Sequence, residues 1–211
     1  MKNYGKFVGG LILAWFLFGL VGSAEHLFQN DGNRIGAAVG IAAGVPVVLF
    51  SLWFAASEGL RRFVLGLNPR VLTGVQAGRI VGFTFLLLEA RALLPGVFAF
   101  SAGYGDMFIG ATATFVAWKL ANPAHRGLFI GWQLLGVMDL VLAVSLGTTA
   151  LWLAPAGPTM APMTVLPLSL IPTFLVPLYL ILHLICIAQA RAWRMEARRG
   201  ERSLTTSRAT V

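Results

Sequence analysis

Long apolar runs, separated by short polar segments, fill the chain as far as residue 190. Crossing about 30 Å of hydrocarbon takes about 20 residues of α-helix. Five runs of suitable length occupy residues 7–24, 35–56, 80–100, 127–153 and 164–190, and a shorter one occupies 107–121. We therefore predict an all-α bundle of six transmembrane spans. It forms a single domain over residues 1–190, followed by a basic tail over residues 191–211.

Composition supports a membrane protein. Of the 211 residues, 57% are hydrophobic and 11% are charged, and mean hydropathy is +0.79. A soluble domain of this length needs a far more polar surface. The first run also has the basic start and the small-residue end of a signal peptide, at Gly22 and Ala24. We interpret it as the first span.

Basic residues predict the orientation of the bundle. Loops on the cytoplasmic side carry an excess of Lys and Arg. In a six-span bundle, fourteen of the sixteen basic residues, among them Arg79, fall on the side of the two termini, and only Arg34 and Arg91 do not. We predict cytoplasmic termini and a multi-pass protein of the cell's inner (cytoplasmic) membrane. The basic tail then faces anionic lipid headgroups, which accounts for the net positive charge without nucleic acid.

The segment Ser101–Asp106 reads SAGYGD, which resembles a K⁺ channel filter. Such a filter needs an extended strand behind a pore helix, and only five residues separate Pro95 from Ser101. We therefore expect no filter. Since the helix from Asp106 to Lys119 would measure only about 20 Å, we predict a short fourth span capped by Asp106. Residues 93–106 would then interrupt the third span as irregular chain inside the membrane. The alternative is a tight turn with nothing bound.

Three ionisable residues are predicted to share one layer of the membrane interior. An α-helix rises about 1.5 Å for each residue. Counted from the basic residues at the cytoplasmic boundary, this rise places Arg91, Asp106 and Asp139 at similar depth. One acid neutralises the arginine, and the second is left over. Buried charges of this kind mark binding sites and ion paths. We predict a ligand-binding or ion-binding site of Arg91, Asp106, Asp139 and the neighbouring Tyr104.

Glu89 and His183 are predicted to lie deeper toward the cytoplasm and to relay protons, since a histidine changes charge near physiological pH. The five ionisable groups would then form a ladder. The alternative is a set of ion pairs that only fixes helix packing.

Other chemistry has weak support. One cysteine, Cys186, excludes an internal disulfide, and His183 has no second histidine at its depth to complete a haem site. We predict no catalytic residue, metal site or cofactor. Gly36, Gly40 and Gly44 have the spacing of a helix-contact face, either within one chain or between two copies.

The segments RIVGFTFLLLEARALLPGVFAFSAGYGDMFIGATA, WQLLGVMDLVLAVSLG and PLSLIPTFLVPLYLILHL resemble an uncharacterised family of bacterial multi-span membrane proteins. The shared pattern is LPxxFAxxAGxGD, then an aspartate on the next long span and a proline-rich last span. The resemblance covers about residues 79–186 and implies no activity.

We expect a small transporter or a proton or ion pathway. One alternative is a sensor that binds a small ligand or a lipid. Another is an accessory subunit that docks on a larger membrane complex. An enzyme is the least favoured class.

Overall fold

The computed structural model describes residues 2–29, 37–153 and 155–209, and this part of the chain is helical without β-strands. Its elements are labelled α for α-helices and η for 3₁₀- or π-helices. They are α1 (Lys2–Ala24), α2 (Ala37–Ala56), α3 (Glu58–Leu65), α4 (Pro69–Val75), η1 (Gln76–Gly82), α5 (Phe83–Glu89), α6 (Gly96–Lys119), η2 (Pro123–His125), α7 (Arg126–Leu153), η3 (Ala161–Thr164), η4 (Ile171–Leu175) and α8 (Val176–Ala209).

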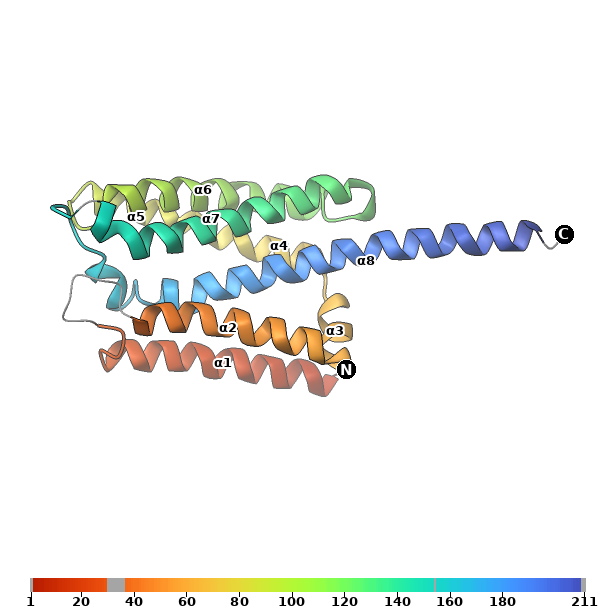
Figure 1. Cartoon of the computed structure of the whole chain (residues 1–211), viewed down its shortest axis with the longest axis horizontal. Coiled ribbons are helices and arrows are strands. Elements are labelled where there is room, and N and C mark those ends of the chain that lie inside the picture. Colours follow the sequence, from red (N-terminus) through yellow and green to blue (C-terminus); the bar gives the residue numbers. More distant parts are fainter. Residues whose placement is uncertain (1, 30–36, 154, 210–211) are drawn as a thin grey trace.

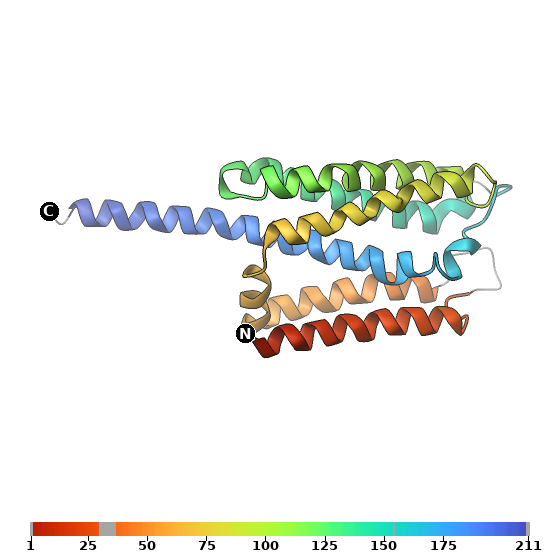
Figure 2. The same cartoon turned by 180° about the vertical axis from the view of Figure 1, so that it is seen from behind.

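The helices form two layers with α8 between them. In Figures 1 and 2, α1 and α2 lie on one side of α8, and the continuous α4–η1–α5 rod lies on the other side with α6 and α7. The rod packs closely along α6, and α8 contacts both α2 and α7. Both ends of the chain lie toward the same end of the bundle. Side chains from the two layers therefore meet along α8.

Five helical segments are long and apolar enough to cross a membrane: Tyr4–Ala24, Ala38–Ala56, Pro69–Glu89, Pro123–Ala150 and Ile171–Trp193. They indicate a multi-pass membrane protein. The 24 residues of α6 are also long enough, at about 36 Å, and α6 lies beside α7. Its glycines, hydroxyls and single aspartate make it less apolar than the other five. The structure thus gives five clear spans, with α6 alongside them.

The predicted interruption of the third span and the predicted short fourth span are both wrong. The third span ends at Glu89, a turn follows, and α6 begins at Gly96 directly after its N-cap residue Pro95. The segment SAGYGD is therefore helical, and Asp106 lies well inside α6 instead of capping a helix. A helical backbone cannot present the carbonyl rings of a K⁺ filter.

The polar segment between the second and third apolar runs is also helical. Ser57 caps α3 by accepting from the Leu60 N–H at 3.2 Å, and Leu60 is buried while Glu58 and Arg62 are exposed. Asn68 then caps α4, with Pro69 at its first position. This is the usual start of a helix. The third span therefore begins at Pro69, well before the apolar run that predicted it.

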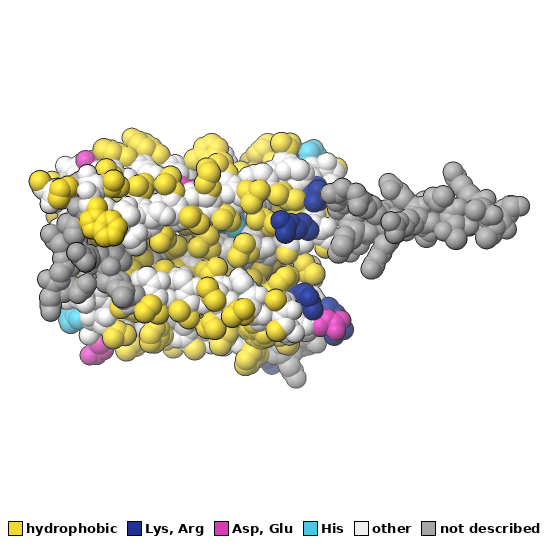
Figure 3. All heavy atoms as spheres, in the orientation of Figure 1, with side chains coloured by type: hydrophobic (Ala, Val, Ile, Leu, Met, Phe, Trp, Pro, Cys, Tyr) yellow, Lys and Arg dark blue, Asp and Glu magenta, His cyan; other side chains and the backbone are white. Residues whose placement is uncertain are grey.

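Basic side chains gather at the end of the bundle where the chain termini lie (Figure 3). The exposed members of this group are Lys6, Arg61, Arg62, Arg70, Lys119 and Arg191. Arg79, which was predicted for this end, is instead buried in the middle of its span. That this end faces the cytoplasm stays a prediction. The predicted tail continues α8 as far as Ala209.

The last span departs from regular α-helix where its prolines lie. It begins with the π-helical turn η4, and Pro177 follows in the first turn of α8. Pro177 has no N–H to donate to the Thr173 carbonyl. The Trp15 Nε1–H on α1 donates to that carbonyl instead, at 3.1 Å, and the Trp15 ring packs edge-on against Phe174. A carbonyl that proline leaves free thus attaches α1 to the bundle.

Candidate charge cluster inside the bundle

Arg79 is the centre of a buried polar cluster. Its side chain is 1% exposed, and its Nε donates to Asp106 Oδ1 at 2.6 Å. Its Nη2 forms an ion pair with Asp139 Oδ2, and its Nη1 donates to the Gly136 carbonyl at 3.4 Å and to His183 Nε2 at 3.3 Å. Residues of η1, α6, α7 and α8 therefore converge on one guanidinium. We name Arg79, Asp106, Asp139 and His183 the charge cluster.

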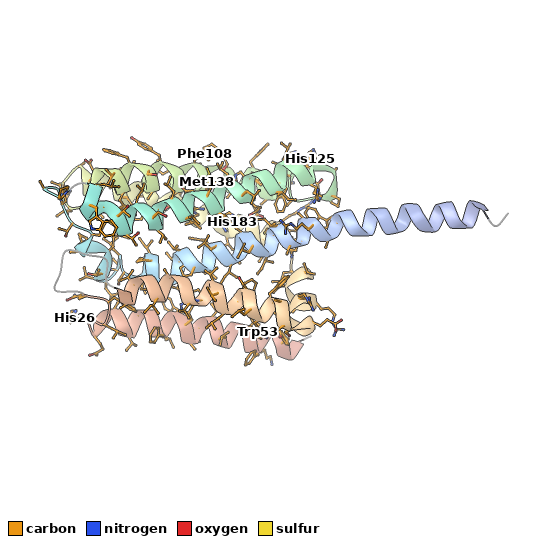
Figure 4. All side chains as sticks on the ribbon, in the orientation of Figure 1. His26, Trp53, Phe108, His125, Met138 and His183 are labelled. Carbon is orange, nitrogen blue, oxygen red and sulfur yellow. The ribbon has the colours of Figure 1, made fainter. Side chains whose placement is uncertain are left out.

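All four members lie near the middle of their helices. Arg79 is at the centre of the span Pro69–Glu89, about 15 Å from each end. Asp139 lies near the centre of α7, and His183 lies near the centre of the span Ile171–Trp193. Figure 4 shows His183 inside the bundle, whereas His26 and His125 lie at opposite ends. The cluster thus occupies the middle depth of the apolar helices.

The hydrogen bonds determine the protonation state of His183. Arginine has donors only, so His183 Nε2 must offer its lone pair to Arg79. His183 Nδ1 then carries the proton and donates to Gln133 Oε1. The chain continues with Gln133 Nε2 donating to Thr73 Oγ1 at 3.1 Å and with a weak Thr73–Cys186 contact at 3.7 Å. His183 is therefore the neutral Nδ1–H tautomer in this arrangement.

Glycines face the cluster where larger residues would collide with it. A Cβ at Gly105 would overlap the Asp139 carboxylate, and a Cβ at Gly136 would overlap the His183 imidazole. Glycine lets one backbone come close to a neighbouring side chain. The two positions thus leave room for the aspartate and the histidine next to the helix surfaces.

The 3₁₀ segment η1 brings the backbone of Arg79 against α6. A Cβ at Gly110 would lie 2.9 Å from the Ile80 Cα, and a Cβ at Gly82 would overlap the Asp106 Cβ. A 3₁₀ segment inside a longer helix often marks a hinge or a functional site. The close approach explains why Asp106 reaches the Arg79 Nε directly.

An apolar pocket lies next to the cluster. It encloses about 580 Å³, part of it open to the surroundings, between α2 on one side and α5, α6 and α7 on the other. Met160 and Met163 line it from the segment before α8, and η4 and the start of α8 complete it. Among the described residues, Asp106 is the only charged one that lines it, so the cluster and the pocket share a carboxylate.

The prediction that Arg91 meets the two acids is wrong. Arg91 is exposed, lies in the turn after α5, and forms no ion pair within the described part of the chain. Asp106 and Asp139 do share one guanidinium, but it belongs to Arg79. The depth count failed because it took Arg79 as a residue of the membrane boundary.

Two further candidates do not reach the cluster. Glu89 is half-buried at the far end of the third span, and no hydrogen bond joins it to His183 among the described residues. Tyr104 is 60% exposed and stacks on Phe100, on the outer surface of α6. His183 does join the acids, through Arg79. The functional roles predicted for these residues stay predictions.

The glycine face on the second span is open. A Cβ at Gly40 or Gly44 would meet no atom within 4 Å, so neither residue packs against another helix in the described part of the same chain. Gly36 lies outside the described residues. Contact with a second copy stays a prediction.

Sequence reasoning missed Arg79, Thr73 and the role of Gly136. The signal for Arg79 was the pair Asn68–Pro69, a helix start that places Arg79 in the middle of a span. No comparable signal marked Thr73 or Gly136, because their contacts come from other helices.

The fold and the charge cluster define a multi-pass membrane protein with a polar centre. The chain belongs to the family described as Domain of unknown function (DUF8737), whose model matches residues 37–191. This match includes the whole charge cluster and excludes α1. No curated protein and no solved structure matches the chain.

Proposed function

We propose that the protein is a small proton-coupled transporter of six spans, with α6 as the fourth, in which Asp106 and Asp139 carry the proton. The observation that supports this function is the imbalance of charge around Arg79. Two carboxylates share one guanidinium, and His183 accepts a hydrogen bond as a neutral ring. One negative charge is left over in the interior, where uncompensated charge is costly.

A proton is the simplest group that removes this charge. It needs one carboxylate oxygen, whereas a metal ion needs several oxygen ligands. Among the described residues, the two aspartates accept hydrogen bonds only from Arg79, and glycines lie close to both carboxylates. In our proposal the site holds one proton when it is closed and releases it when it opens to water.

Arg79 controls how tightly the proton is held. With both carboxylates ionised, Arg79 contacts both. Protonation of one aspartate weakens its ion pair, which frees η1 or α6 to move relative to α7. The 3₁₀ segment that carries Arg79 is a suitable place for that movement.

Binding of a small ligand by a sensor is the second candidate. The apolar pocket beside Asp106 favours it, because pockets with apolar walls and a few polar groups are typical of small-molecule sites. Such a sensor would bind the ligand without moving protons across the membrane.

The test is proton movement across liposomes that contain the purified protein and a pH-sensitive dye. With a membrane potential imposed, we expect proton entry that Asp139→Asn or Asp106→Asn abolishes. Glu58→Gln is the matched control, because Glu58 is an acid with a 73% exposed side chain outside the cluster. Entry should be unchanged in this control.

A folded Asp139→Asn protein that moves protons as fast as the unsubstituted protein would contradict the proposal. If no proton moves in either protein while ligands still bind, the sensor is supported instead.

A further inference from the structure

We propose that the pocket next to Asp106 binds a hydrophobic amine, a small molecule with an apolar body and a protonated nitrogen. The inference rests on the proposed function, since it names the substrate class of the same site. The pocket lies between the two layers, with α2 on one side, α6 and α7 on the other, and η4 also in its wall. A ligand there would contact both layers at once.

The walls of the pocket select an apolar body. Most of the lining consists of aliphatic, aromatic and methionine side chains, and Thr148 supplies the only hydroxyl group among the described lining residues. Part of the pocket is open to the surroundings, so an apolar ligand can enter it from the membrane side. A hydrated inorganic cation would lose its water ligands in this pocket, and the apolar walls offer no oxygen atoms to replace them.

The carboxylate selects a positive charge. Asp106 Oδ1 accepts from Arg79 Nε, and Asp106 Oδ2 accepts no hydrogen bond from the side chains and backbone that the structure describes. The Asp106 side chain is 16% exposed and lines the pocket. A ligand N⁺–H therefore has a free acceptor at the pocket wall. An anionic ligand would be repelled by the same oxygen.

An ammonium group and a proton remove the same excess charge. When the amine binds as its ammonium ion, the negative charge beside Arg79 is neutralised, so the proton held by the two aspartates leaves to water. Charge and atoms balance: one cation enters the site and one leaves it. Binding of the ligand and of the proton is thus mutually exclusive, which is the condition for exchange across a membrane.

The test is calorimetric titration of the purified full chain in detergent with 4-phenylbutylamine, 4-phenylbutan-1-ol and 4-phenylbutanoate. These probes share one apolar body and differ in charge. We expect the amine to bind at least about tenfold more tightly than the alcohol, the ratio expected for a hydrogen bond to a charged group. The carboxylate should bind most weakly. Equal affinities for the amine and the alcohol would overturn the inference.

Two variants locate the site. Ala143→Phe places a bulky ring in the pocket while keeping both carboxylates, and should weaken amine binding at least about tenfold, as a lost charged hydrogen bond would. Ala111→Phe is the matched control, because Ala111 is exposed and lies outside the pocket. Unchanged affinity in Ala143→Phe would overturn the inference. In Asp106→Asn, the affinity for the amine should fall to the affinity for the alcohol.

Repeating the amine titration in buffers of different ionisation enthalpy counts the protons released. Amine binding without proton release supports the ligand site and contradicts proton coupling. Proton entry into liposomes without amine binding supports the proposed function and overturns this inference.

Discussion

Gly136 on α7 lies directly against the imidazole ring of His183 on α8, so closely that a single methyl group would overlap the ring. The same glycine offers its carbonyl to Arg79. One residue without a side chain thus positions both the histidine and the arginine. This contact connects helix packing with the chemistry of the cluster.

Gly136→Ala should destabilise the bundle by about 1–3 kcal/mol, the usual cost of overpacking. Gly131 is the control, because it lies earlier on α7 and a Cβ there meets nothing within 4 Å. Gly131→Ala should be stabilising by about 0.5–1 kcal/mol, since alanine favours a helix more than glycine does. Unfolding in detergent measures both. Equal effects of the two substitutions would show that the contact with His183 is not tight.

Arg79→Gln should cost about 3–5 kcal/mol of stability, because it leaves two buried carboxylates without their cation. The control is Arg62→Gln. Arg62 pairs with Glu58 at 3.8 Å, and both side chains are largely exposed, at 76% and 73%, so its loss should change the unfolding free energy little. The same unfolding experiment compares the two variants. A stable Arg79→Gln protein would mean that the aspartates are already neutral without the arginine.

The spans were predictable because their apolar runs match the length that a membrane requires. The start of the third span was not. The segment GLNPRVLTGVQAGR contains two arginines and three glycines and reads as a loop, yet α4 and η1 bury part of it against α6 and α8. Tertiary packing here outweighs local composition.

The two acids and the histidine of the candidate site could be predicted from the sequence, but their arginine could not. Asp106, Asp139 and His183 stand out because ionisable residues inside apolar runs are rare. Which arginine pairs with them depends on where each helix begins and on how η1 packs against Gly110. If Arg79 is placed at the membrane boundary, Arg91 becomes the arginine predicted to pair with the two aspartates.

Trp15→Phe should loosen α1. The substitution keeps the aromatic contact with Phe174 but removes the hydrogen bond to the Thr173 carbonyl. Pro177 cannot donate to that carbonyl, so the Thr173 carbonyl is left without this donor. We expect the free energy of unfolding to fall by about 1–3 kcal/mol. Faster proteolysis near α1, or a lower midpoint of unfolding, would show it.

Trp118→Phe is the control for α1, because Trp118 is 72% exposed. It should leave both measurements unchanged. If the two tryptophan variants behave alike, the hydrogen bond to the π-helical turn does not hold α1.

His183 should be observed as the Nδ1–H tautomer. Arg79 can only donate to it, and Gln133 Oε1 can only accept from it. Nitrogen NMR of histidine-labelled protein at neutral pH distinguishes the two tautomers. The signal assigned by His183→Asn should carry its proton on Nδ1. A proton on Nε2 would require a different partner for Arg79 Nη1.

One of the two aspartates beside Arg79 should carry a proton. Infrared spectroscopy of the protein in lipid measures it directly, because a protonated carboxyl absorbs apart from a carboxylate. We expect one protonated carboxyl band that shifts in heavy water and is lost in both Asp106→Asn and Asp139→Asn, but is kept in Glu58→Gln. Absence of this band in the unsubstituted protein would show that both aspartates are ionised at neutral pH and that neither carries the proton.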